Sequence, residues 1–139
     1  MREFSIVIPI YNEKENILPL IEEIIFLLKN KYKYEILVID DASNDNLDID
    51  ILKKKSDFIK IFKNDKNQGQ SRSILKGINY SEFDTIVTID GDGQNNPADI
   101  EKLANIYFSD KDCHLVGGIR FKRKDYFIKK ITLIFISFK

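Results

Sequence analysis

The feature that most constrains the fold is a short apolar run that ends abruptly at two aspartates. Residues 85–89 (Thr-Ile-Val-Thr-Ile) contain no proline or glycine, and their β-branched side chains favour a buried strand. The run stops at residues 90–94, Asp-Gly-Asp-Gly-Gln. Side chains alternate along an extended chain, so Asp90 and Asp92 are expected on one side, roughly 7 Å apart. Two converging carboxylates predict a bound hard divalent cation, to which Gln94 could add a carbonyl oxygen.

The bulk composition fits one ordinary domain. At 139 residues, the chain is long enough to bury roughly two-thirds of its unfolded surface. The chain has 22 Lys+Arg and 22 Asp+Glu residues, so its formal net charge is zero and gives no general attraction to nucleic acid. The single cysteine excludes an internal disulfide and fits a reducing compartment. We expect no secretory leader and no membrane-spanning helix, because no apolar run reaches about 20 residues.

Strand-like and helix-like segments alternate along the chain. Short apolar runs predict five strands, at residues 4–9, 34–40, 58–62, 85–89 and 114–118. Helical spacing of apolar residues fills the gaps between them, and a proline is best tolerated in the first turn of a helix. Pro19 therefore predicts that the first helix begins near Glu15 or Asn16, and Asn96 with Pro97 predicts the start of the last one. This alternation is typical of an α/β fold with a mostly parallel sheet flanked by helices.

Polar residues cluster directly after the predicted strands. In open α/β sheets, ligands bind at the carboxyl ends of the strands, especially where the strand order reverses. In the common order 3-2-1-4, the ends of the first and fourth strands meet. That order would place residues 11–13 (Tyr-Asn-Glu) beside residues 90–92 (Asp-Gly-Asp).

Four of these polar motifs resemble, in order and spacing, the large family of inverting glycosyltransferases with a GT-A (Rossmann-like) fold, glycosyltransferase family 2. The motifs are residues 8–13, 38–45, 67–70 and 90–97. Gln94-Asn95-Asn96-Pro97, together with residues 116–120 and 123–125, is similar to the polyprenyl-phosphate branch typified by dolichyl-phosphate mannose synthase. The resemblance covers nearly the whole chain. It implies a single domain over 1–139, with a nucleotide-sugar-binding part at 1–119 and a basic, then apolar, membrane-proximal segment at 120–139.

The resemblance also implies a reaction. It would be the metal-dependent, inverting transfer of a sugar from a nucleoside-diphosphate sugar to a polyprenyl (dolichyl or undecaprenyl) phosphate. Mg²⁺ or Mn²⁺ would be held by Asp90, Asp92 and Gln94 and would neutralise the leaving diphosphate. Asp92 and Arg120 are the catalytic candidates.

The implied nucleotide-binding residues are Pro9, Tyr11, Glu13, Asp40, Asp41 and Asp90. An aromatic ring can pack on a base, and carboxylates can accept from base N–H groups or ribose hydroxyls. Taken alone, Glu13 could equally be a first-turn helix acid and Asp41 a capping residue. Residues 67–70 (Asn-Gln-Gly-Gln) could present backbone N–H groups to a phosphate or simply form a turn.

The acceptor side falls on the last twenty residues. Arg120 and Arg123 are the candidates for the acceptor phosphate, because a guanidinium bonds phosphate in bidentate fashion. A solvated basic face is the simpler alternative for both. The basic residues followed by apolar residues 131–138 suit a segment on an anionic membrane, which predicts a peripheral protein at the cytoplasmic face. A core helix, or a packing surface for further chain, is the alternative.

Other functions stay open at this point. Members of the polyprenyl-phosphate branch continue past the basic segment, so a truncated, non-catalytic domain that binds nucleotide sugar or membrane is one alternative, with a homo-oligomer or a partner chain as a further option. A phosphatase with Asp90 and Asp92 as nucleophile and general acid is another. A calcium-binding loop fits poorly, since Asn95 replaces the turn glycine and a strand precedes it.

Overall fold

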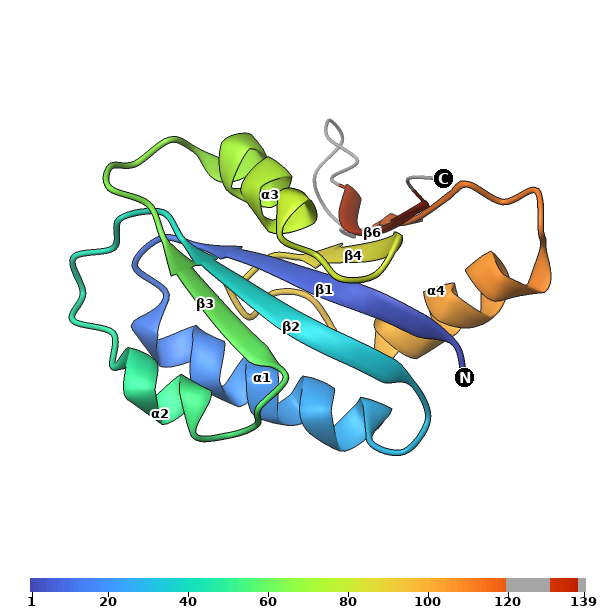
Figure 1. Cartoon of the computed structure of the whole chain (residues 1–139), viewed down its shortest axis with the longest axis horizontal. Coiled ribbons are helices and arrows are strands. Elements are labelled where there is room, and N and C mark those ends of the chain that lie inside the picture. The colour runs from blue at the N-terminus through green and yellow to red at the C-terminus, as the bar shows by residue number, and fades with distance from the viewer. Residues whose placement is uncertain (120–130, 138–139) are drawn as a thin grey trace, which may run out of the picture.

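The computed structural model describes residues 1–119 and 131–137, and within them a six-stranded sheet carries helices on both faces (Figure 1). In chain order the elements are β1 (Glu3–Ile10), α1 (Lys14–Leu28), β2 (Lys33–Asp40), α2 (Ile49–Lys53), β3 (Ile59–Lys63), α3 (Gln70–Asn79), β4 (Thr85–Ile89), α4 (Ala98–Ser109), β5 (Leu115–Ile119) and β6 (Ile131–Ser137). The predicted α/β class and the five predicted strands are confirmed, and β6 is an addition. Among the described residues, no helix is long and apolar enough to span a bilayer.

The sheet has the order β3-β2-β1-β4-β6-β5. β1 pairs in parallel with both β2 and β4, and β3 pairs in parallel with β2. β6 runs antiparallel to its neighbours β4 and β5. The predicted order 3-2-1-4 is therefore confirmed, and the carboxyl ends of β1 and β4 lie side by side.

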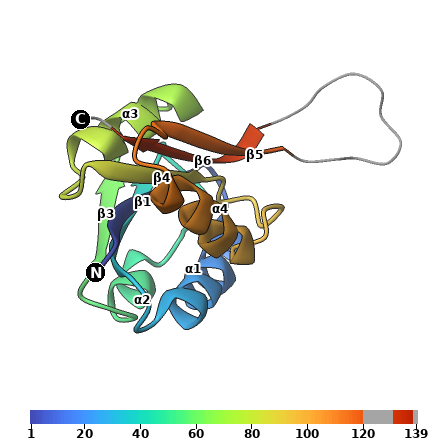
Figure 2. The ribbon, with the colours of Figure 1, turned by 90° about the vertical axis from the view of Figure 1, so that its right-hand side faces the viewer.

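Two apolar layers hold the helices against the sheet. The helices α1, α2 and α4 lie on one face, and α3 lies on the other (Figures 1 and 2). Because both faces are covered, β1 and β2 are buried at almost every position, which explains their nearly continuous apolar sequences. The α3 side packs closely through small residues. A Cβ at Gly77 would lie 2.4 Å from Cγ1 of Val7, so this glycine lets α3 approach β1.

Two helix starts test the capping arguments. α1 begins at Lys14, one residue before the predicted window, because the Glu13 carbonyl already accepts the N–H groups of Asn16 and Ile17. Pro19 therefore lies in the second turn, where its missing N–H costs the helix one backbone bond. α4 begins at Ala98 with Pro97 at its N-cap position, one residue later than predicted, but Asn96 still bonds to the first N–H of the helix. The Oδ1 of Asn96 accepts the N–H of Ala98 at 3.0 Å.

The apolar segment 131–137 forms a strand that the sequence pattern does not predict. Residues 131–137 were expected to lie on a membrane or to form a helix or packing surface, but they form β6 between β4 and β5. Phe135 is fully buried, with its ring 5.7 Å from that of Phe4 and 5.8 Å from that of Tyr107. β6 pairs with a strand on each edge and contacts α4, and among residues 134–137 Phe135 is buried while the other three are half-buried. The predicted membrane association of the segment stays a prediction. The basic residues 120–130, including Arg120 and Arg123, lie outside the described residues.

Candidate functional site

A pocket of about 200 Å³ opens at the carboxyl ends of β1 and β4. It brings together six of the predicted site residues, namely Pro9, Tyr11, Glu13, Asp41, Asp90 and Asp92. Ile10, Gln70, Ser73 and Gly91 complete the lining. The predicted neighbourhood of residues 11–13 and 90–92 is therefore confirmed. Asp40 and Gln94 do not line this pocket.

The pocket depends on a close approach between two loops. β1 and β4 pair from Ser5 with Ile86 to Val7 with Thr88, so β4 ends two residues short of the end of β1 and the loop after it runs beside the last residues of β1. A Cβ at Gly91 would lie 2.5 Å from Cγ2 of Ile10 and 3.2 Å from the Pro9 carbonyl oxygen. Glycine is thus the residue that lets the chain after β4 lie against the end of β1.

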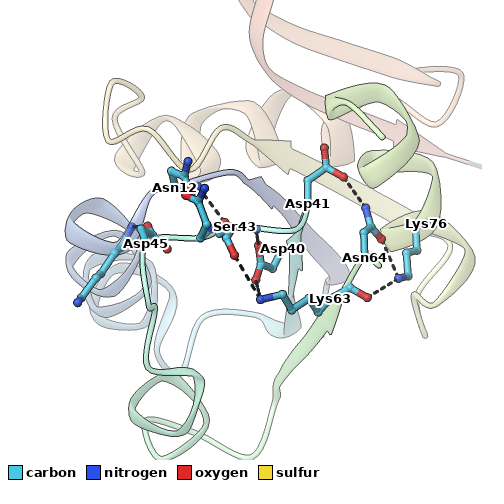
Figure 3. Close-up of polar contacts among 10 residues, drawn as sticks. Asn12, Asp40, Asp41, Ser43, Asp45, Lys63, Asn64 and Lys76 are labelled. Atoms are coloured by element: carbon cyan, nitrogen blue, oxygen red, sulfur yellow. Dashed lines mark hydrogen bonds and ion pairs between the residues drawn. The ribbon is translucent and has the colours of Figure 1, made fainter. Parts of the chain in front are cut away.

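The loop after β1 is fixed by the loop after β2 (Figure 3). Asn12 has a φ of 57°, and its N–H donates to the Ser43 hydroxyl at 2.9 Å, while its side-chain oxygen accepts the Asn44 N–H. The Lys14 N–H donates to the Asp45 carboxylate at 2.8 Å. These bonds hold Tyr11, which is 47% exposed, at the pocket wall.

Asp40 is occupied by its own turn. Its side chain is buried at the end of β2, where Oδ1 accepts the Ser43 N–H at 2.8 Å. Oδ2 lies 3.5 Å from the Lys63 ammonium (Figure 3). These contacts assign Asp40 to the structure of the turn, and its predicted nucleotide-binding role stays a prediction.

Asp41 anchors the loop that precedes α3. Its Oδ1 accepts from the Asn64 amide at 2.7 Å and from the Gln68 N–H at 2.8 Å, and its Oδ2 accepts the Gly69 N–H at 2.8 Å. Asn64 is held in turn by the Lys76 ammonium, which donates to its Oδ1 at 2.8 Å (Figure 3). The turn at residues 67–70 therefore binds a carboxylate of the protein through the backbone N–H groups that a phosphate could have used.

These bonds also set the charge state of Asp41. Burial raises the pKa of this carboxyl, but the hydrogen bonds that it accepts outweigh the burial and hold the pKa below its usual value. The donors are Asn64, Gln68, Gly69 and Ser73. Asp41 is therefore an anion at neutral pH, although it is only 4% exposed.

The two aspartates after β4 have different partners. The side-chain amide nitrogen of Gln70 donates to Oδ1 of Asp90 across the pocket. Oδ1 of Asp92 accepts the N–H of Gln94 at 3.0 Å, which closes a tight turn. Gln94 thus supports Asp92 through its backbone, and its predicted role as a metal ligand stays a prediction.

The carboxylate oxygens of the pocket suit a hard divalent cation that also binds the phosphates of a ligand. Within residues 1–119 and 131–137, no group of three or more His, Cys, Asp or Glu side chains forms a metal cluster. Mg²⁺ in particular is commonly bound through one or two carboxylates plus substrate phosphates, and Asp90 and Asp92 provide such a pair. The lining also contains Glu13 and Asp41, and no lysine or arginine stands among its described residues. The carboxylates among these described residues therefore favour an anionic ligand that carries a cation.

Sequence reasoning missed several residues of this site. Gln70 belonged to a recognised motif, but nothing in the sequence connected it to Asp90, which lies 20 positions away. Asn64 and Lys76 gave no signal, because their role depends on contacts with Asp41 across the fold. The glycine between the two aspartates was a usable signal for a close backbone approach.

The chain matches a known protein family. The pattern of glycosyl transferase family 2 matches residues 5–138. An undecaprenyl-phosphate 4-deoxy-4-formamido-L-arabinose transferase of Yersinia enterocolitica is 35% identical over 135 residues. The enzyme of that name from Serratia proteamaculans is 32% identical over 136 residues. Both alignments cover 94% of the chain, and the chain spans 40% of the length of each relative.

Solved structures share the fold. PcManGT, a mannosyltransferase from Pyrobaculum calidifontis in complex with GDP-Man and Mn²⁺, superposes with a TM-score of 0.77. It is 17% identical, and the match covers 96% of this chain and 44% of that one. Residues 1–349 of the S. aureus protein TarS superpose with a TM-score of 0.62 at 21% identity, covering 78% of this chain and 33% of that one. The architecture of the sheet and its helices is therefore that of GT-A glycosyltransferases.

Proposed function

Because the chain belongs to glycosyl transferase family 2, we propose that it carries out metal-dependent, inverting transfer of a sugar from a nucleoside-diphosphate sugar to a polyprenyl phosphate. The observation that carries the proposal is the pocket in which Tyr11 and Glu13 face Asp90 and Asp92. The names of the two relatives support undecaprenyl phosphate as the acceptor class. Since the chain spans 40% of their length, the activity of these residues alone is part of the proposal.

In this proposal, two sides of the pocket bind different parts of the nucleotide-sugar donor. Tyr11 presents an exposed ring on which a nucleobase can pack, and Glu13 can accept from the base or the ribose. Asp90 and Asp92 would lie at the diphosphate and would hold Mg²⁺ or Mn²⁺ between them and the phosphates. The PcManGT complex, which contains GDP-Man and Mn²⁺, supports such a pairing of donor and cation. When bound, the cation would supply Lewis-acid stabilisation of the departing diphosphate.

Electrostatic repulsion from the described carboxylates favours a bound cation in this proposal. Two like unit charges about 6 Å apart repel by roughly 3 kcal/mol at an effective dielectric near 20. Four carboxylates line the pocket, so a bare diphosphate would meet several such repulsions. The carboxylates of Asp90 and Asp92 therefore favour the diphosphate as its metal complex over the free anion.

The acceptor half of the reaction rests on residues outside the described ranges. An acceptor phosphate is already anionic, so its attack needs positioning and charge compensation more than a strong base. We assign this role to Arg120 and Arg123, and we propose that the domain works peripherally at the cytoplasmic face of a membrane.

The direct test is sugar transfer by the purified 139-residue chain. Vesicles with undecaprenyl phosphate would be incubated with labelled nucleotide sugars and Mn²⁺, and the lipid product would be extracted and counted. Transfer that is lost in Asp92→Ala and retained in Asp112→Ala, an exposed aspartate outside the pocket, would support the proposal. Tight donor binding without transfer would favour the non-catalytic alternative. The family match favours sugar transfer over the phosphatase alternative, which would require a covalent aspartyl-phosphate at Asp90.

A further inference from the structure

Gln70 connects the start of α3 to the Asp90 side of the pocket. It is the first residue of α3, and its side chain lines the pocket together with Asp90. The amide nitrogen of Gln70 donates a hydrogen bond to Oδ1 of Asp90, on the loop after β4. This bond joins two elements that are not adjacent in the sequence.

Hydrogen bonds to Asp41 fix the backbone just before Gln70. Gly69 has a φ of 89°, in the left-handed region that favours glycine, and its N–H is bonded to Asp41. The Gly69 carbonyl accepts the Ser73 N–H at 3.1 Å, which closes the first turn of α3. Asp41 also holds the preceding N–H, that of Gln68. The peptide that carries Gln70 therefore has few other orientations.

We propose that Gln70 is a positioning residue that orients the Asp90 carboxylate for the metal-bound diphosphate. This inference rests on the proposed function. An amide at this point has a chemical advantage, because it donates a hydrogen bond without adding a positive charge. A lysine or arginine in its place would neutralise Asp90 and compete with the cation for it. Partners of metal ligands commonly act in this way, and their loss costs about 10–100-fold in metal affinity.

The first experiment measures the contact itself. In ¹⁵N-labelled protein, the side-chain amide resonance of Gln70, assigned by its loss in Gln70→Ala, is followed in Asp90→Ala and Asp92→Ala. The inference predicts a large shift in Asp90→Ala and a small one in Asp92→Ala. Equal small shifts in both variants would refute the contact, without any assumption about ligands.

The second experiment measures Mn²⁺ binding by electron paramagnetic resonance, in the presence of excess UDP and, separately, excess GDP. Gln70→Ala should weaken Mn²⁺ binding about tenfold, at the low end of the range for such partners. Gln68→Ala is the matched control. Its side chain is exposed and lies outside the pocket lining, and the substitution keeps the N–H that bonds to Asp41. The control should bind Mn²⁺ within about twofold of wild type, in line with a surface substitution.

A double-mutant cycle separates positioning from direct ligand contact. If Gln70 acts through Asp90, adding Gln70→Ala to Asp90→Ala should change Mn²⁺ binding less than about twofold. The same tenfold loss in both backgrounds would overturn the inference, as would wild-type binding by Gln70→Ala. Failure of the wild type to bind Mn²⁺ with either nucleotide would instead overturn the proposed function.

Discussion

Asp41→Asn offers a sharp test of the structure, because it replaces one hydrogen-bond acceptor of the side chain with a donor. In Asp41→Asn, one of the two carboxylate oxygens becomes an NH₂ group. Whichever side it takes, that group faces a backbone N–H, from Gln68 at Oδ1 or from Gly69 at Oδ2. Two donors then oppose each other inside a nearly fully buried site.

The size of the effect follows from the bonds that are lost. A hydrogen bond to a charged group contributes about 1.5–3 kcal/mol, and the bonds that the introduced amide keeps would be to a neutral oxygen and weaker. We therefore expect Asp41→Asn to lower the free energy of unfolding by about 2–4 kcal/mol at neutral pH. Asp65→Asn, at an exposed residue of the same loop region, should change it by less than about 0.5 kcal/mol.

The pH dependence gives an independent check. The folded-state pKa of Asp41 is lowered, so its contribution to stability is fully present above the unfolded-state pKa, near 4. That contribution is lost as the pH falls through the lowered folded-state pKa. Urea unfolding from about pH 7 to pH 3 should therefore show the gap between wild type and Asp41→Asn narrowing only below about pH 4. A gap that stays constant to pH 3, or an initial gap below about 0.5 kcal/mol, would refute the reasoning.

Three further substitutions test other parts of the account. Gly91→Ala should cost about 1–3 kcal/mol in urea unfolding by overpacking against Ile10 and should weaken nucleotide binding; wild-type stability would show that the close approach is absent. Phe135→Ala should lower the free energy of unfolding by about 3–5 kcal/mol, because Phe135 is fully buried; a decrease under about 1 kcal/mol would show that this side chain does not lie in the core. Asp92→Ala should abolish metal-dependent nucleotide binding in calorimetry with little change in melting temperature, because the bond that it loses, from the Gln94 N–H, belongs to a short turn; unchanged affinity would remove Asp92 from the metal site.

The parallel half of the fold was predictable because local pattern and global position agree there. β1, β2 and β4 are short β-branched runs, each followed by a polar turn and then by a helical repeat. Burial on both faces makes such runs continuous, so their apolar character is unambiguous. The position of the pocket followed from the strand order, which brings the ends of β1 and β4 together.

β6 and the polar network were not predictable, because their positions depend on contacts between residues that lie far apart in the sequence. β6 reads as the apolar end of a basic-then-apolar segment, and its pairing with β4 and β5 depends on contacts made far along the chain. Asp40 and Asp41 are adjacent and chemically identical, yet Asp40 closes its own turn while Asp41 lines the pocket. Only the direction of each side chain at the end of β2 separates them, and neither composition nor spacing records that direction.

The central claim is that this pocket binds a nucleoside diphosphate together with a divalent cation. Thermal unfolding of the 139-residue chain against a panel of nucleotide sugars, with and without Mn²⁺, tests it most directly. We expect one donor to raise the melting temperature only when Mn²⁺ is present, and we expect Asp92→Ala to remove the effect. Equal stabilisation with and without Mn²⁺, or stabilisation that survives in Asp92→Ala, would contradict it.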